Sequence, residues 1–193
     1  MKIVGVGCGP GMLTKEAIQA IASAALIYGS DRAIELARPH IPPDCIVKTI
    51  DDFKALHTLP KEVVVLSTGD PMLAGLGYLD GEVVPGISSL QVAAARLRIP
   101  LAQIVPVVAH GTGHEQGMQD TVDAVSQKKI VFLLADPKFD ILELYKRLQL
   151  LGIPLKVVVC ENLGYPDERI TVDHIGAPPV PVCGLYSLVV GNF

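Results

Sequence analysis

Residues 63–77 read VVVLSTGDPMLAGLG, and this stretch decides the fold class. The β-branched run at residues 63–66 predicts a short buried strand, which stops abruptly at Ser67-Thr68-Gly69-Asp70-Pro71. In open α/β sheets the crevice that binds a ligand lies just beyond the carboxyl ends of the strands. The stretch therefore predicts an α/β protein with a ligand site at this junction.

The residues of the junction also limit the kind of ligand. Gly69 allows the backbone to approach a bound group closely, and Pro71 fixes the loop and removes one donor. Asp70 is anionic and disfavours phosphate. A hydroxyl, an amine or a cationic group fits the loop better.

Predicted strands and helices alternate through the first half of the chain. Strands are predicted at residues 3–6, 26–29, 63–66 and 82–85, and helices at 14–25, 31–38 and 88–97. Thr14 is the expected N-cap of the first helix, and Ile18, Ile21 and Ala25 are expected to form its buried face. Alternation of this kind predicts a largely parallel sheet.

The second half has a different pattern. Strands are expected at 105–109, 130–134, 155–160, 169–175 and 185–190, and helices at 115–126 and 139–150, the latter closed by Gly152. The last three strands have little helix between them, which predicts a mixed sheet. Residues 101–106 are the expected linker. We therefore predict two α/β lobes, residues 1–102 and 107–193, with a cofactor cleft between them.

Composition excludes several classes of protein. Half of the 193 residues are hydrophobic, 19% are charged and the net charge is −4, without a basic cluster, so nucleic acid is not an expected partner. The four cysteines form no CxxC pair, so neither a metal site nor a redox dithiol is predicted. No apolar run is long enough to span a membrane and no signal-peptide pattern is present, so a cytoplasmic location is expected.

Two further motifs follow predicted strands. Residues 5–11 read GVGCGPG, which fails the G-x-G-x-x-G dinucleotide pattern in both frames, and the chain has no G-K-[ST] phosphate loop. The glycines serve either close approach to a ligand or only a tight turn. Residues 83–90 read VVPGISSL; Ser88 and Ser89 can bind a ligand at a helix start, or one of them can simply cap the helix.

The ordered set GVGCGPG, STGDPMLAG and VVPGISS resembles the tetrapyrrole methylase superfamily, whose members bind S-adenosylmethionine between two α/β lobes. Residues 28–32, YGSDR, and His110-Gly111 resemble the branch of precorrin C5-methyltransferases, although Thr112 stands where that branch often has Arg. The resemblance implies methylation at C5 of cobalt-precorrin-7 or precorrin-6Y. It also implies a homodimer, and a separate C15-methyltransferase and decarboxylase acting on the same macrocycle.

The resemblance also implies a set of site residues. Gly69 and Asp70 are expected at the methionyl and ribose parts of the cofactor, and Ser88 and Ser89 at its methionyl group. The other residues of the set are expected to surround the rest of the cofactor. The expected cofactor-binding residues are Cys8, Gly9, Pro10, Gly69, Asp70, Leu73, Ser88, Ser89, Leu134 and Leu163. His110 is the first candidate for a catalytic side chain, ahead of His114, Glu161 and Tyr28. Arg32, Arg96 and Arg98 either clamp substrate carboxylates or form a solvated face.

Three functions stay open at this point. The favoured one is a corrinoid-pathway methyltransferase. The second keeps the fold and cofactor but changes the acceptor to another precorrin carbon or to a protein side chain, as in diphthine synthesis. The third is a nucleotide-binding or regulatory module without catalysis.

Overall fold

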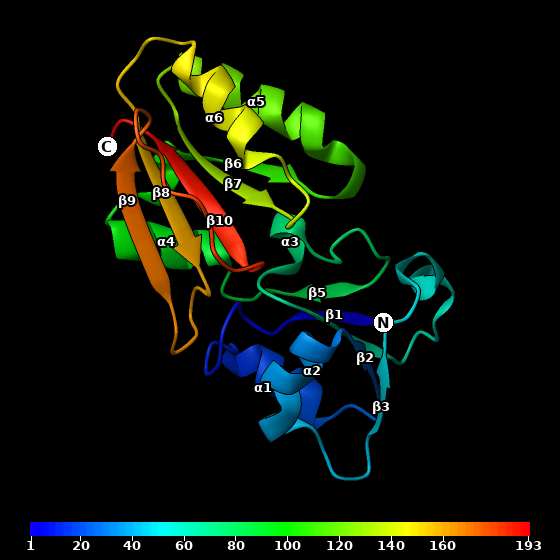
Figure 1. The fold of residues 1–193 in the computed structure, drawn as a ribbon. Helices are drawn as coiled ribbons and strands as arrows, with labels where there is room; N and C mark the ends of the chain where they lie inside the picture. Colours follow the sequence, from blue (N-terminus) through cyan, green and yellow to red (C-terminus); the bar gives the residue numbers. More distant parts are fainter. The chain divides into compact units, whose positions relative to one another are not determined.

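The computed structural model describes residues 1–193, except for the side chain of Thr112. The chain divides into two compact units, Met1–Ser89 and Leu90–Phe193, each with its own sheet (Figure 1). The α/β fold class and the change from a parallel to a mixed sheet are confirmed. No helix of the described residues is both long and apolar enough to cross a bilayer.

The first unit is built on a parallel sheet with the strand order β3-β2-β4-β1-β5. Its strands are β1 (Lys2–Gly5), β2 (Leu26–Gly29), β3 (Ile46–Thr49), β4 (Val64–Ser67) and β5 (Glu82–Val84). Its helices are α1 (Lys15–Ala22), α2 (Asp31–Ala37), α3 (Pro71–Ala74) and the 3₁₀ turns η1 (Arg38–His40) and η2 (Phe53–Thr58). Strand β3 is not predicted from the sequence, because all four of its residues are exposed at the sheet edge and show no alternation.

Helix α1 begins as predicted and ends early. The Thr14 side chain accepts a hydrogen bond from the Ala17 N–H at 3.1 Å. Ser23 ends the helix by donating to the carbonyls of Gln19 and Ala20, both at 3.1 Å. Ala25 therefore lies beyond the helix and is exposed, so its predicted place on the buried face is wrong; Ala24 is buried instead.

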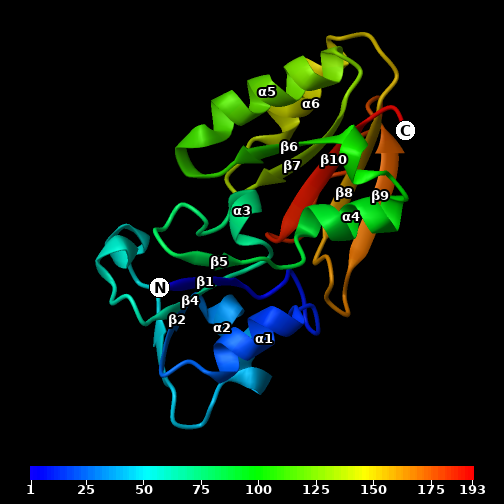
Figure 2. The same ribbon diagram turned by 180° about the vertical axis from the view of Figure 1, so that it is seen from behind.

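The second unit carries a mixed sheet with the strand order β6-β7-β10-β8-β9, in which only β6 and β7 run parallel. Its strands are β6 (Ile104–Ala109), β7 (Ile130–Ala135), β8 (Lys156–Glu161), β9 (Arg169–His174) and β10 (Tyr186–Gly191). Its helices are α4 (Ser89–Leu97), α5 (His114–Ser126), α6 (Ile141–Gln149) and the 3₁₀ turns η3 (Leu101–Gln103) and η4 (Gly111–Gly113). Helices α5 and α6 cover one face of this sheet and α4 lies against the other (Figure 2).

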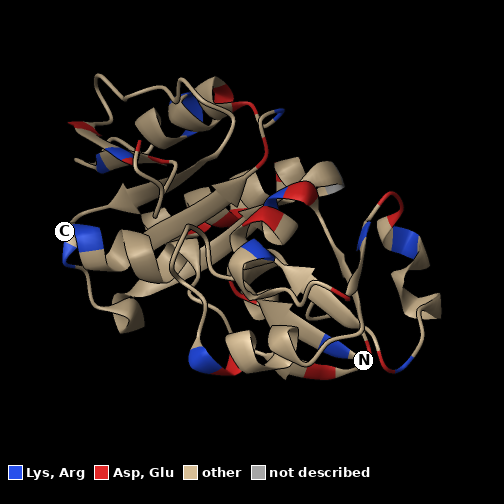
Figure 3. Ribbon diagram, turned by 90° about the horizontal axis from the view of Figure 1, so that it is seen from below, with Lys and Arg blue, Asp and Glu red and all other residues tan. Residues whose placement is uncertain are grey.

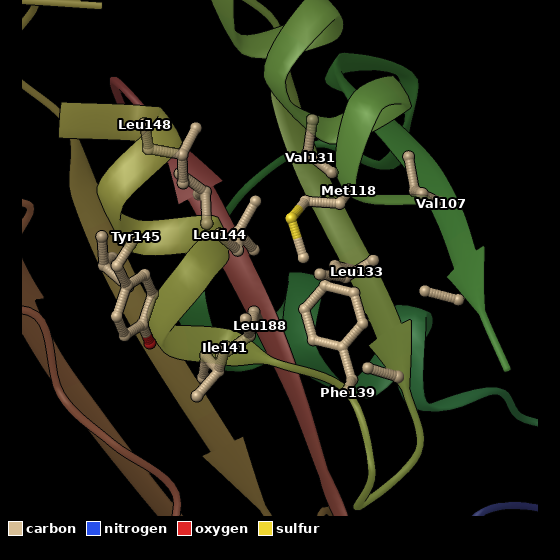
Figure 4. Packing of buried hydrophobic residues seen from close by; sticks show 14 of the residues in the cluster. Val107, Met118, Val131, Leu133, Phe139, Ile141, Leu144, Tyr145, Leu148 and Leu188 are labelled. Atoms are coloured by element: carbon tan, nitrogen blue, oxygen red, sulfur yellow. The ribbon is translucent and has the colours of Figure 1, made fainter. Parts of the chain in front are cut away.

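The core of the second unit lies under α5 and α6. Met118 from α5 and Leu144 and Leu148 from α6 pack on Leu133 and Leu188 of the central strands (Figure 4). Each of these side chains is at most 3% exposed. Fully burying one large aliphatic side chain stabilises a fold by about 1.5–3 kcal/mol, so this layer holds the helices firmly on the sheet.

The expected linker at residues 101–106 is part of the second unit. Leu101–Gln103 forms η3, and Ile104 already pairs with Ile130 in the sheet. Pro106 is tolerated within β6 because β6 is an edge strand, where a missing N–H costs little. The division between the two units falls earlier, between Ser89 and Leu90.

Candidate functional site

Strand order brings the three sequence motifs to one edge of the first sheet. Strand β1 lies between β4 and β5, and all three run parallel. Their carboxyl ends therefore meet at one edge, where GVGCGPG follows β1, STGDP follows β4 and VPGISS follows β5. This edge is where open α/β sheets bind ligands.

Backbone hydrogen bonds join the three loops. Gly7 and Gly69 bond each other through both N–H groups, at 3.2 and 2.8 Å, and form an isolated antiparallel bridge. The Cys8 N–H donates to the carbonyl of Ile87 at 3.0 Å. Gly7 and Gly69 have φ of +79° and +70°, a backbone region that favours glycine. The loops thus form one connected layer rather than three independent turns.

Gly86 is required for the close packing of this layer. A Cβ added to Gly86 would lie 2.1 Å from the carbonyl oxygen of Gly69 and 2.9 Å from the backbone of Gly5. Around Gly69, by contrast, the nearest atom to an added Cβ is the Cα of Ser88 at 3.9 Å. The layer is therefore dense beneath the loops and has room beside the Gly69 backbone.

Asp70 anchors two of the loops. Its Oδ1 accepts from the Met72 N–H at 2.8 Å and caps α3, while its Oδ2 accepts from the Gly86 N–H at 2.9 Å. A carboxylate has about four acceptor positions, so two remain for a ligand. The structure thus gives Asp70 a structural role that the sequence motif alone does not indicate.

The other expected residues of the first unit lie in or next to these loops. Cys8, Gly9 and Ser88 are buried, Leu73 and Ser89 are half-buried, and Pro10 is exposed. The Cys8 thiol donates to the Met12 sulfur at 3.6 Å. The structure therefore brings the expected cofactor residues of this unit to one edge of the sheet.

In the second unit, the expected residues Leu134 and Leu163 lie at the ends of two strands. Leu134 is half-buried near the carboxyl end of β7, and Leu163 is buried in the turn after β8. In that turn the Gly164 N–H donates to Glu168 Oε2 at 2.7 Å, and Arg96 of α4 donates to Glu168 Oε1 at 2.6 Å. The Leu163 turn is therefore fixed by an ion pair to α4.

Glu161 is occupied within its own unit. Its carboxylate accepts from Arg169 Nε at 2.7 Å and from the N–H groups of Val182 and Cys183 at 2.7 and 2.9 Å. Burial raises the pKa of this carboxyl, but the Arg169 hydrogen bond and the two N–H groups outweigh it, so the pKa lies below its ordinary value. Glu161 fastens the segment before β10 and stays ionised.

Parallel pairing of β6 and β7 brings a histidine and an aspartate together. His114 Nε2 lies 2.8 Å from Asp136 Oδ2, which also accepts from the Gly111 N–H at 2.8 Å. His110, the first candidate from the sequence, is exposed just after β6. The hydrogen bonds from His114, Gly111 and Lys138 hold the pKa of Asp136 well below its usual range.

Asp136 is absent from the residues expected from the sequence, although a signal for it exists. It is followed by Pro137, so the strand-Asp-Pro pattern of Asp70-Pro71 occurs a second time, after β7. Both aspartates use Oδ1 to accept the N–H two residues on, at 2.8 Å, and Oδ2 to accept a glycine N–H of another loop. Only Asp136 adds a histidine.

The remaining candidates are dispersed, as are the Lys and Arg segments in general (Figure 3). Tyr28 lies on β2 with Lys48 Nζ 5.6 Å from its ring centre. Arg32 on α2 has a buried Nε without a partner among the described residues, and Arg98 follows α4 with φ of +57°. Tyr28 and Arg32 belong to the first unit and Arg98 to the second.

Comparison with known proteins identifies the family. Residues 2–178 match the family model of the Tetrapyrrole (Corrin/Porphyrin) Methylases, so the chain belongs to this family and is a methyltransferase. It is 31% identical over 191 residues to a probable cobalt-precorrin-7 C(5)-methyltransferase of Methanocaldococcus jannaschii, with 88% of each chain covered.

Solved structures agree with this family. The cobalamin biosynthesis precorrin-6Y methylase from Archaeoglobus fulgidus superposes with a TM-score of 0.77 at 30% identity, covering 99% of this chain and 96% of that one. A uroporphyrin-III C-methyltransferase from Thermus thermophilus, solved with S-adenosylhomocysteine, gives a TM-score of 0.69 at 20% identity, covering 98% and 96%. The second likeness concerns the fold alone.

Proposed function

We propose that this protein is an S-adenosylmethionine-dependent methyltransferase of cobalamin biosynthesis that methylates C5 of cobalt-precorrin-7 or precorrin-6Y. The observation that carries the proposal is the joined layer of three loops at the carboxyl edge of β4, β1 and β5. The 31% identity to a probable cobalt-precorrin-7 C(5)-methyltransferase supports this acceptor over other precorrin carbons and over diphthine synthesis.

The residues of the layer suit S-adenosylmethionine. This cofactor presents an ammonium, a carboxylate and ribose hydroxyls but no phosphate. The open side of Gly69 admits a ligand to the backbone, and the free acceptor positions of Asp70 suit a hydroxyl or ammonium. Gly69, Asp70, Ser88 and Ser89 would hold the methionyl and ribose parts. The others, Cys8, Gly9, Pro10, Leu73, Leu134 and Leu163, would surround the rest.

The cofactor supplies an electrophilic methyl group when bound. The chain's own contribution to transfer is to hold the acceptor carbon and the methyl group in line, since well-oriented reactants gain about 7–11 kcal/mol from positioning. A rigid loop layer serves this purpose, because the backbone hydrogen bonds between its loops and the two hydrogen bonds of Asp70 leave it little freedom. Arg32 and Arg98 are the side chains we propose for carboxylates of the macrocycle.

Two partners belong to the proposal. The first partner is a second copy of the chain, which would form a homodimer. Half of the residues are hydrophobic, which supports a dimer, and light scattering at micromolar concentration tests it. A separate protein would carry out C15 methylation and decarboxylation on the same macrocycle. The family resemblance supports this division of labour, and product analysis with the isolated chain tests it.

Calorimetric titration tests the cofactor. We expect saturable binding of S-adenosylmethionine and S-adenosylhomocysteine, and no binding of NAD or ATP, because the loops lack both phosphate-binding patterns. Binding of NAD or ATP without binding of S-adenosylmethionine would instead support a regulatory nucleotide-binding module and refute the proposal.

A further inference from the structure

The His114–Asp136 pair lies outside the expected cofactor residues and has the geometry of an oriented base. His114 opens α5 just after β6, and Asp136 follows β7. Because β6 and β7 are parallel, with Ala109 paired to Ala135, both side chains lie at the same sheet edge. Leu134, one of the expected cofactor residues, lies two positions before Asp136 at this edge.

The pair defines which nitrogen of His114 carries a proton. Asp136 is ionised and can only accept hydrogen bonds, so the 2.8 Å contact requires a proton on Nε2. The neutral ring then has its lone pair on Nδ1. Phe139 packs edge-on against the ring at 5.7 Å between centroids and fixes its plane. His114 is therefore held as a base that presents Nδ1.

The surroundings leave the ring reachable. The His114 side chain is 26% exposed. Gly111 and Gly113 precede it in sequence, and a Cβ added to either glycine would have no neighbour within 4 Å. Asp70 accepts hydrogen bonds from the same two kinds of N–H group without a histidine. An aspartate alone is therefore enough to anchor such a loop, and the loop at Asp136 does not need His114 for this purpose.

We propose that His114, oriented by Asp136, accepts the proton that the substrate carbon loses when it is methylated. The inference rests on the proposed function, since it assigns the base for that reaction. It makes His114 a catalytic residue and Asp136 a positioning residue. It also assigns the proton transfer to His114 in place of His110, the first candidate from the sequence.

The proposed step is methylation of the carbon followed by transfer of its proton to His114. A π-electron pair of the macrocycle forms the new carbon–carbon bond while the bond from the methyl carbon to sulfur breaks and its electrons stay on sulfur. The methylated carbon then bears one proton too many. His114 Nδ1 takes this proton, and the electrons of the carbon–hydrogen bond return to the macrocycle. The resulting imidazolium is stabilised by the Asp136 carboxylate, as in triads of the same logic.

Other titratable groups lie on the elements around His114 and could contribute to a pH profile. Elements α5 and α6 carry Glu115 and Arg147, which form an ion pair at 2.7 Å, and β10 carries Tyr186, whose hydroxyl donates to the Asp136 carbonyl at 3.3 Å. The titratable groups on His114's own and neighbouring elements and loops are Asp136, Lys138, His110, Glu115, Glu143, Arg147 and Tyr186. A pH effect is therefore assigned to His114 only if the His114 variant removes it.

The test compares His114→Gln, Asp136→Asn and the control His174→Gln. Gln keeps an N–H donor for Asp136 but has no base. His174 is an exposed histidine beside Asp173 on β9, away from this edge. We expect the single-turnover methyl-transfer rate to fall about 100- to 1,000-fold in His114→Gln, less in Asp136→Asn, and to stay within twofold in the control. Calorimetric affinity for S-adenosylmethionine should change less than threefold in all three.

Two further readouts separate catalysis from structure. Any pH dependence of the wild-type rate that comes from His114 should be absent from His114→Gln. Nitrogen-15 NMR of the free protein should show His114 protonated on Nε2 only. A protonated Nδ1, or a His114→Gln rate within threefold of wild type, overturns the inference. A wild-type protein that makes no methylated product overturns the proposed function itself, and the inference with it.

Discussion

At the scale of single residues, glycines decide how closely the three loops approach. Gly86 has no room for a side chain, since an added Cβ would meet the Gly69 carbonyl at 2.1 Å. The sequence leaves open whether the glycines of residues 5–11 serve a ligand or only a tight turn, and at Gly69 it predicts close approach of a bound group. The structure separates the two uses: Gly86 serves packing, and Gly69 has an open side.

Gly86→Ala should therefore separate the loops. We expect a loss of about 1–3 kcal/mol in the free energy of unfolding, because an inserted methyl group must displace backbone, and at least tenfold weaker binding of S-adenosylmethionine. Urea unfolding and calorimetry measure the two effects. Gly184→Ala is the control, because its Cβ would meet only Pro137 Cγ at 3.4 Å. Equal effects in both variants would contradict the assigned packing role.

Asp70→Ala should weaken both the fold and cofactor binding. The variant removes the acceptor for the Met72 and Gly86 N–H groups, and loss of such a cap costs about 1–2 kcal/mol. The sequence alone predicts weaker binding with an intact fold, so the structural cost is new. Unfolding and titration are compared with Asp80→Ala, an exposed carboxylate. An Asp70→Ala protein with unchanged cofactor affinity would argue against the proposed binding role.

At the scale of secondary-structure elements, the buried strands are predicted from the sequence. Of the two strands without a buried residue, β9 is predicted and β3 is not. Runs such as residues 130–134 are continuously apolar and rich in β-branched and aromatic residues, which favours a buried strand. Strand β3, with the sequence IVKT, has no continuous apolar run because it is an exposed edge that pairs with β2 alone. Because proline is rare in strands, Pro106 favours a linker in the sequence. In the structure it lies within β6 instead, which is an edge strand and tolerates proline.

Glu161 links the stability of β8, β9 and the segment before β10 to pH. Its pKa is lowered in the folded state, so it contributes stability above its ordinary pKa, and this contribution is lost as the pH falls through the folded value. Glu161→Gln should cost about 1–3 kcal/mol at pH 7, with a smaller difference from wild type below pH 4. Urea unfolding between pH 3 and 7 measures this.

The control for this prediction is Glu62→Gln, an exposed carboxylate in the first unit. It should leave the unfolding free energy nearly unchanged at every pH. If the loss of unfolding free energy in Glu161→Gln stays constant from pH 7 to pH 3, the stabilising role assigned to the ionised Glu161 carboxylate is wrong.

At the scale of the whole molecule, three sequence motifs are enough to recognise the family. The sequence does not show, however, that the three motifs lie side by side in the fold. Only the strand order shows that β1 lies between β4 and β5, so that loops 60 to 80 residues apart in the chain bond one another. Asp136 is not predicted from the sequence for the same reason. Its hydrogen-bond partners Gly111 and His114 are more than 20 residues away in the chain, and the pairing of β6 with β7 brings them together.

The central claim is that this member of the tetrapyrrole methylase family methylates C5 of cobalt-precorrin-7. The most direct test is a methyl-transfer assay with the purified chain, cobalt-precorrin-7 and S-adenosylmethionine carrying a carbon-13 methyl group. We predict one labelled methyl group per macrocycle, attached at C5 by NMR, together with S-adenosylhomocysteine in equal amount. A folded protein that binds the cofactor yet leaves the macrocycle unlabelled, or labels a different carbon, would contradict the claim.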